Sequence, residues 1–216
     1  SYLTDEQIIT RLKLLSTYIK HAIVQDYELY PYVSDYYEHV HILPLACRTD
    51  RIPFKYPRAD NREPVIIHAP TNREFKGSEY VEKAVADLKG TVPFTYRVIE
   101  KMSHSEAMKQ YLQADIIVDQ ILCGTYGMLS VEAMAMGKVV IAYIRDDVKA
   151  HLPSSLPIVV ANPDTIRDVL HDLLRNPERM RKIGMAGREY VKKVHDVGRV
   201  IPKLLKIYAQ LQPEGS

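Results

Sequence analysis

The chain lacks several features that would assign it at once to a class of protein. Its charge is nearly balanced, with 29 Lys and Arg against 27 Asp and Glu, so composition gives no support for a nucleic-acid partner. No apolar run approaches the roughly 20 residues needed to span a bilayer, and no signal peptide is visible. For 216 residues we expect a cytoplasmic protein with one large domain, or one domain and a piece of another.

Patterns typical of metal sites are also missing. Cys47 and Cys123 lie far apart without metal-ligand spacing, which argues against both a zinc site and a disulfide framework. Asp146 and Asp147 follow a predicted strand, but an Asp pair on a turn is more often solvated than metal-bound. We therefore expect no metal.

A regular alternation of apolar strands and helices is present after residue 64. Strands are predicted over 64–70, 94–99, 115–119, 139–144 and 157–161. Helices are predicted over 78–89, 104–113, 127–136, 163–175, 177–195 and 200–211. Asn162 and Asn176 are expected N-caps, and Gly137 an expected C-cap. This order predicts a doubly wound parallel α/β sheet, which binds ligands beyond the carboxyl ends of its strands.

The first 64 residues have a different pattern. A helix is predicted over 4–21 with Thr4 or Asp5 as N-cap, followed by strands over 22–25 and 39–43 with turns between them. Residues 47–64 are rich in Arg, Lys, Asp and Pro and resemble a linker. The chain opens with Ser-Tyr-Leu and ends with Gln-Pro-Glu-Gly-Ser, so we expect part of the natural protein to be missing.

The crossover over 115–144 carries the most informative residues. A turn with Gly124 and Gly127 permits close ligand approach, and the amides of residues 125–129 open the following helix. Glu132 lies one turn later among apolar neighbours. There we expect its carboxylate either to accept hydrogen bonds from the hydroxyls of a ribose or to form a structural salt bridge with Arg or Lys. The turn matches neither G-x-G-x-x-G nor a Walker A loop, and Ser130 lacks a nucleophile-elbow context.

The loop after the first strand of the sheet carries two cations. Arg73 and Lys76 precede a helix N-terminus, where they either bind a diphosphate or are simply solvated. His68, at the strand exit, either contacts a ligand or hydrogen-bonds a neighbouring loop.

Residues 64–196 resemble the nucleotide-sugar-binding domain of GT-B glycosyltransferases, in particular the retaining group 1 (family 4) enzymes. The segment G-T-Y-G-M-L-S-V-E-A-M-A-M-G-K-V-V-I, residues 124–141, resembles the family signature E-G-F-G-x-x-x-x-E-A-M-A-x-G-x-P-V-I. The chain departs from it at Gly124, where the glutamate that contacts the donor sugar normally stands, and at Val139, which replaces proline. We consider Asp119 or Gln120 as substitutes for that sugar contact.

The resemblance implies roles for individual residues. Arg73 and Lys76 are the expected catalytic residues, which stabilise the leaving diphosphate. The expected nucleotide-sugar site comprises His68, Gly124, Thr125, Tyr126, Gly127, Met128, Leu129 and Glu132. The resemblance implies no cofactor, because the nucleoside diphosphate sugar is a substrate and protein cations replace a metal.

The resemblance also implies a domain plan. Residues 1–60 resemble the tail of the acceptor-side domain and a linker, 61–198 form the Rossmann-like nucleotide-sugar domain, and 199–216 form a C-terminal helix and tail. The partners are then a nucleoside diphosphate sugar and the missing N-terminal acceptor domain, and the full-length enzyme is compatible with membrane association.

The predicted activity is transfer of a hexosyl-type group from a nucleoside diphosphate sugar to an acceptor hydroxyl, with retention. The fragment alone is expected to bind nucleotide and to be inactive. Two alternatives remain: a GT-B nucleotide-sugar epimerase, and a non-catalytic flavodoxin-like module in which Gly124 marks a degenerate nucleotide site.

Overall fold

The computed structural model describes residues 4–211, which divide into two compact units. The larger unit comprises residues 46–197, and the smaller unit combines the chain before residue 46 with the chain from residue 198 onward. Within the described residues, no helix is both long and apolar enough to cross a membrane.

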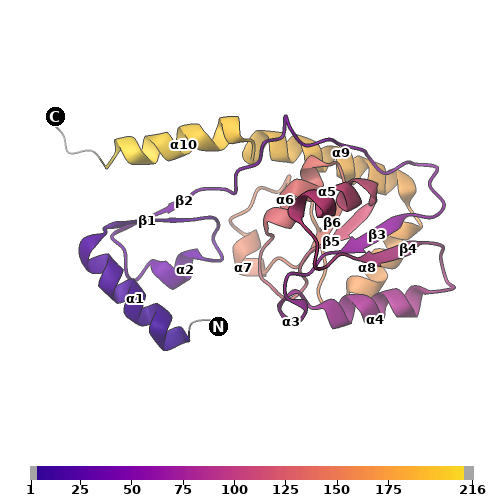
Figure 1. Cartoon of the computed structure of the whole chain (residues 1–216), viewed down its shortest axis with the longest axis horizontal. Helices are drawn as coiled ribbons and strands as arrows, with labels where there is room; N and C mark the ends of the chain where they lie inside the picture. The colour runs from indigo at the N-terminus through magenta and orange to yellow at the C-terminus, as the bar shows by residue number, and fades with distance from the viewer. Residues whose placement is uncertain (1–3, 212–216) are drawn as a thin grey trace. The chain divides into compact units, whose positions relative to one another are not determined.

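The larger unit contains a five-stranded sheet in the order β4-β3-β5-β6-β7, and every neighbouring pair is parallel (Figure 1). Its strands are β3 (Val65–His68), β4 (Thr95–Val98), β5 (Ile116–Val118), β6 (Val139–Ala142) and β7 (Val159–Val160). Its helices are α3 (Arg73–Lys76), α4 (Ser78–Leu88), α5 (His104–Gln113), α6 (Met128–Ala135), α7 (Asp146–Lys149), α8 (Ile166–Leu174) and α9 (Pro177–Val194). The predicted doubly wound α/β fold is confirmed.

Helices cover both faces of the sheet because its central strands are apolar on both sides. Ile116 and Val118 of β5 join a core cluster with α4 and α8, and the intervening Ile117 is also fully buried. Side chains alternate between the two faces of a strand, so Ile117 packs on the opposite side. Such continuous apolar runs are typical of parallel strands, which lie between two helical layers.

The smaller unit contains α1 (Asp5–Tyr18), β1 (His21–Val24), α2 (Tyr30–Val33), β2 (His39–Ile42) and most of α10 (Val197–Ala209). Strands β1 and β2 form a parallel pair. Thr4 is the N-cap of α1, and it forms a capping box with Gln7. Helix α1 buries no side chain, and Val24 is the sole buried residue of β1 and β2.

Three details of local structure differ from the sequence-based predictions. The short helix α3 was not predicted; Asn72 caps it, and Gly77 ends it with a left-handed φ of 72°. Helix α8 begins at Ile166 rather than residue 163, because Asn162 accepts hydrogen bonds from the amides of Asp164 and Thr165 and holds a turn. Residues 146–149 form the short helix α7 rather than a turn, and Asp146 and Asp147 are exposed, as expected.

Candidate functional site

The predicted site residues lie at or after the ends of β3 and β5, at the carboxyl edge of the larger sheet, and Arg145, which was not predicted, follows β6. These strands are adjacent and parallel, so the segments that leave them emerge at one edge. Lys76 follows β3, the glycine-containing turn follows β5, and Arg145 follows β6. The order of strands therefore brings together residues that lie up to about 70 positions apart in the chain.

A buried carboxylate organises the centre of this edge. Asp119 lies directly after β5 and is completely buried. Its Oδ1 accepts a hydrogen bond from Lys76 Nζ at 2.5 Å, and its Oδ2 accepts one from Ser130 Oγ at 2.7 Å. The amide of Gly127, the N-cap residue of α6, also donates to Oδ2 at 3.4 Å. Asp119 thus neutralises the lysine and caps the helix at the same time.

Lys76 lies beside the α6 N-terminus, as expected of a phosphate-binding residue, but its charge is already paired. Its side chain is 11% exposed and that of Asp119 is 0% exposed, so the ion pair is screened little by water. A phosphate at this position therefore competes with the Asp119 carboxylate for the same ammonium group.

Glu132 has a partner that the sequence did not identify. Its carboxylate accepts a hydrogen bond from His104 Nε2 at 2.9 Å, so the partner is a histidine rather than the Arg or Lys that the sequence favours. The His104 side chain is 70% exposed and that of Glu132 is 11% exposed. His104 begins α5 and forms the solvent-facing side of the pair, so it covers the Glu132 carboxylate from the surface.

Arg73 is not directed at the Asp119 cluster. Its guanidinium forms ion pairs with Glu82 of α4 and, at 3.3 Å, with Glu100 after β4. These hydrogen bonds raise the pKa of Arg73. The structure therefore separates the two cations that were predicted to bind one diphosphate together, because α3 directs Arg73 toward the flank of the sheet and Lys76 toward its centre.

His68 fits the alternative in which it hydrogen-bonds neighbouring segments. The ring is completely buried, with Nδ1 2.9 Å from the Val118 carbonyl and Nε2 2.8 Å from Ser78 Oγ. Nδ1 must donate to the carbonyl, so Nε2 accepts from the hydroxyl. Burial lowers the pKa of His68, which keeps the ring neutral. Since both nitrogens are engaged, His68 positions β5 and α4 beneath the site.

The turn between β5 and α6 is held by contacts on both sides. Gln120 Nε2 donates to the Thr125 carbonyl at 2.6 Å, and the Tyr126 hydroxyl lies 3.1 Å from His195 Nε2. The Thr125 hydroxyl is buried and has no hydrogen-bond partner among the described residues. The side chains of Thr125 and Tyr126 are thus both buried within the protein.

The Arg145 side chain packs against Gly124, where a larger residue would carry its own side chain. A Cβ added at Gly124 would lie 3.1 Å from Arg145 Cβ and 3.3 Å from its Nη1, and the Arg145 amide donates to the Gly124 carbonyl at 2.9 Å. The guanidinium also pairs with Asp147, with Nε 2.5 Å from the carboxylate. An arginine thus stands beside the position where the sequence lacks a glutamate.

Among the predicted site residues, the structure brings together Lys76, Gly127 and Glu132 near the start of α6, and Met128 and Leu129 form its partly exposed first turn. Sequence reasoning missed Asp119 as the organising carboxylate, His104 and Arg145. An Asp directly after an apolar strand was the one visible signal for Asp119. Among residues 4–211, no group of three or more His, Cys, Asp or Glu is arranged to hold a metal ion.

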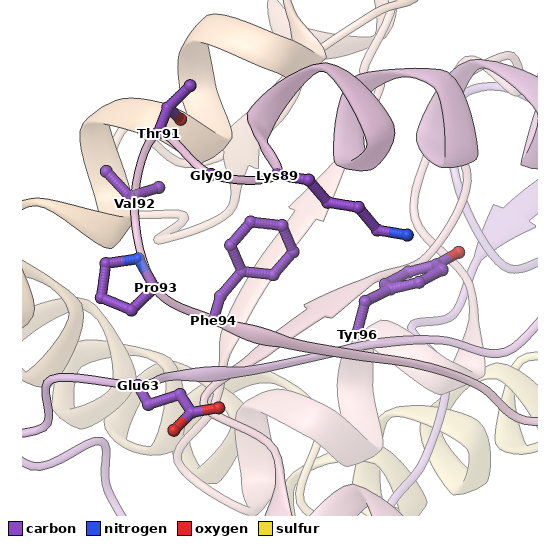
Figure 2. A pocket seen from close by; sticks show the side chains of 8 residues that line it. All are labelled: Glu63, Lys89, Gly90, Thr91, Val92, Pro93, Phe94 and Tyr96. Carbon is purple, nitrogen blue, oxygen red and sulfur yellow. The ribbon is translucent and has the colours of Figure 1, made fainter.

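A cavity of about 640 Å³ lies away from this edge, at the start of β4 and the end of α4 (Figure 2). Its lining includes Phe94 and Tyr96, together with one cation, Lys89, and one anion, Glu63. Figure 2 shows the Lys89 side chain extending toward the Tyr96 ring. The cavity contains none of the predicted site residues.

The sequence matches the model of one protein family, and the structure is similar to many solved structures. The model of a family described as glycosyl transferase-like matches residues 65–206. No curated protein sequence matches the chain. Sucrose-phosphate synthase from Thermosynechococcus elongatus has a similar fold, with a TM-score of 0.71 and 18% identity over 97% of this chain.

Two further structures extend this comparison. Anabaena HepE, solved in complex with UDP-glucose, aligns with a TM-score of 0.74 and 10% identity over 96% of this chain. S. aureus TarM, in a complex that includes UDP, aligns with a TM-score of 0.70 and 12% identity, also over 96%. The chain spans 64% of the length of the synthase, 68% of HepE and 48% of TarM. At these identities the similarity establishes the fold.

Proposed function

Because this chain belongs to the glycosyl transferase-like family, we propose that it is the donor-binding part of a glycosyltransferase. It would transfer a glycosyl group, of hexosyl type, from a nucleoside diphosphate sugar to an acceptor hydroxyl with retention of configuration. The acceptor site would lie in a further domain, since the chain spans only about two thirds of the synthase and HepE.

One observation carries this proposal: the start of α6, Glu132 and Lys76 meet at the carboxyl edge of a parallel sheet. Helix N-terminal amides and a lysine suit a diphosphate, and a carboxylate one turn into the helix suits two ribose hydroxyls. The carboxyl edge is where ligands bind in sheets of this type. HepE, which shares the fold, has been solved with UDP-glucose and with UDP.

The reaction requires charge stabilisation at the leaving group. The bond between the sugar anomeric carbon and the diphosphate oxygen breaks, and its electron pair remains on that oxygen. A bond forms from the acceptor oxygen, and the hydroxyl proton departs with base or solvent. Lys76 and the amides at the start of α6 stabilise the developing diphosphate charge, which supports a mechanism without a metal.

Ligand binding requires two exchanges of partners in this site. The diphosphate takes the place of Asp119 on Lys76, and the ribose takes the place of His104 on Glu132. Lys76 and Glu132 each exchange an internal partner for ligand oxygens, while Asp119 and His104 lose theirs, so the release of the buried Asp119 carboxylate opposes diphosphate binding. Without ligand, both carboxylate oxygens of Asp119 are engaged, Oδ1 by Lys76 and Oδ2 by Ser130, so a contact from Asp119 to the donor sugar would also require displacement of one of these partners.

The test is calorimetric titration with UDP, GDP and ADP and with their common sugars. One diphosphate should bind selectively, and Glu132→Ala should weaken its binding by about tenfold to a hundredfold, because charge-assisted hydrogen bonds contribute roughly 1.5–3 kcal/mol. Glu178→Ala, an exposed carboxylate on α9, is the matched control and should leave affinity unchanged.

Three outcomes separate the alternatives. A gain in affinity from one attached sugar supports transferase or epimerase activity, and isomerisation of that sugar nucleotide identifies an epimerase. Equal affinity in wild type and Glu132→Ala contradicts the site assignment. If neither this chain nor the full-length protein binds any nucleoside diphosphate while folded, the result supports a non-catalytic module.

A further inference from the structure

A second cavity of about 270 Å³ lies at the amino edge of the larger sheet, opposite the proposed donor site. Its lining includes Val65, the first residue of β3, and Asp115 and Lys138, which immediately precede β5 and β6. The strands are parallel, so residues that precede them and residues that follow them lie at opposite edges. This cavity is therefore separate from the cluster around Asp119.

Four cations line this amino-edge cavity, namely Lys55, Arg58, Arg97 and Lys138. Lys138 is the innermost of them, with only 1% of the residue exposed. Its Nζ donates to the carbonyls of Lys55 at 2.6 Å and Leu112 at 2.8 Å. An ammonium group has three N–H donors, so these two bonds fix its position and leave donor capacity for a ligand.

The one carboxylate in the lining, Asp115, is held by neutral hydrogen-bond donors and offsets one of the four positive charges. Asp115 is 9% exposed, and its Oδ2 accepts hydrogen bonds from Asn61 Nδ2 and from the Val65 amide, both at 2.9 Å. Arg58 also forms two hydrogen bonds with Asp60, from Nη2 at 2.6 Å and from Nε at 2.9 Å, but both side chains are 70% exposed, so a phosphate would compete with Asp60 for this guanidinium. Positive charge thus exceeds negative charge around the cavity.

The pKa of Lys138 is also relevant to anion binding. Burial lowers the pKa of its ammonium group to about 8; attraction by Asp115 opposes this lowering, and the smaller repulsion from Lys55 adds to it. An anion in the cavity would favour the charged form of Lys138. By contrast, the larger cavity beside Phe94 has one lysine and one glutamate in its lining, so it has no such excess of charge (Figure 2).

We propose that the amino-edge cavity is a binding site for a small dianion, a phosphate group carried as inorganic phosphate or as a compact monoester. Arg58 and Arg97 supply planar forks that match phosphate oxygens, and Lys138 supplies a fixed ammonium group at the inner end. The site is independent of the donor site and of the proposed transferase activity.

The experiment is an NMR titration of the whole chain with inorganic phosphate at constant ionic strength, with glycerol phosphate as the monoester. Amide shifts should change at Asn61, Val65 and Arg97 and saturate. If glycerol phosphate binds more tightly than inorganic phosphate, the site is specific for a monoester. If it binds equally well or more weakly, the site is one for inorganic phosphate. Shifts confined to residues 127–129, at the start of α6, would overturn the proposal.

Variants make the assignment specific. Arg97→Gln and Lys55→Gln change exposed residues and should weaken phosphate binding at least about tenfold, while UDP affinity stays unchanged. Lys89→Gln, in the cavity of Figure 2, is the matched control and should alter phosphate affinity less than twofold. Equal phosphate affinity in all three variants and the wild type would refute the site. Lys138 is left intact because its ammonium group holds two carbonyls of the fold.

Discussion

At the scale of single residues, Asp119 decides how the proposed donor site behaves without ligand. We expect Asp119→Asn to lower the free energy of unfolding by about 3 kcal/mol, because it leaves the buried Lys76 ammonium group without a counterion. Added UDP should stabilise this variant more than the wild type, since its diphosphate no longer competes with a carboxylate. Urea unfolding with and without UDP measures both effects.

Ser130→Ala is the control for Asp119→Asn. It removes one hydrogen bond to Asp119 but no charge, so it should cost only about 1 kcal/mol. Equal losses in the two variants would show that the charge of Asp119 is unimportant for Lys76.

Lys138 predicts a pH dependence of stability in the alkaline range. Its pKa is lowered from 10.5 to about 8 in the folded protein, so between these values the unfolded chain binds more protons. Stability contributed by this group therefore rises with pH across that window, by up to roughly 3 kcal/mol for the full shift. Urea unfolding of wild type and Lys138→Met at pH 7.5 to 10.5 measures the difference, and parallel curves would contradict the shift.

The sequence predicted some of these residues and missed others for a physical reason. Gly127, Glu132 and Lys76 could be identified because helix starts, apolar helical faces and loops after strands have local signatures. The pairing of Lys76 with Asp119, and of Glu132 with His104, joins residues 43 and 28 positions apart. Such pairs depend on strand order and helix packing, which a local pattern does not encode.

At the scale of elements, the packing of α9 against α6 and β6 depends on one glycine. A Cβ added at Gly184 would lie 2.2 Å from the Gly137 carbonyl oxygen, a backbone atom that cannot move away freely. We expect Gly184→Ala to lower the free energy of unfolding by about 3 kcal/mol through overpacking. Thermal and urea unfolding measure the loss.

Gly187→Ala, one turn later on α9, is the matched control. Its added Cβ would meet the flexible Met134 side chain at 3.3 Å, and alanine gains about 1 kcal/mol of helix propensity over glycine. We expect its stability to stay within about 1 kcal/mol of the wild type. A similar loss in both variants would indicate general crowding along α9 rather than this one backbone contact.

Element types were more predictable than element ends. The period-2 and period-3.6 patterns identified the strands and longer helices, since burial of one face imposes those periods. The ends depended on side-chain choices with several outcomes: Asn162 forms a turn instead of a cap, and Asn72 caps the unpredicted α3. Asparagine favours both arrangements, so composition alone does not select between them.

At the scale of the whole molecule, the two proposed anion sites lie at opposite edges of the parallel sheet. They also differ in how far their positive charges are paired with carboxylates. At its carboxyl edge Lys76 is paired with Asp119, Arg73 with two glutamates and Arg145 with Asp147, so ligand binding there is an exchange. At the amino edge, cations outnumber carboxylates, so an anion can bind there without first replacing a carboxylate at every cation. UDP affinity should consequently fall less steeply with salt than phosphate affinity at the amino edge.

The two compact units should differ sharply in local stability. Helix α1 buries no side chain within the described structure, and an isolated helix of 14 residues is marginal in water. Strands β5 and β6 consist entirely of buried residues. Hydrogen exchange should therefore show protection factors at least about a hundredfold lower in α1 than in β5 and β6, because α1 amides open by local fraying and the central strands open only with global unfolding.

Helix α4 provides the internal control for this exchange experiment. It is 11 residues long, shorter than α1, but it buries five side chains, including Val81 and Leu88. If burial sets protection, α4 amides should exchange more slowly than α1 amides despite the shorter helix. Equal protection of α1 and α4 would instead contradict the view that side-chain burial sets the local stability of these helices.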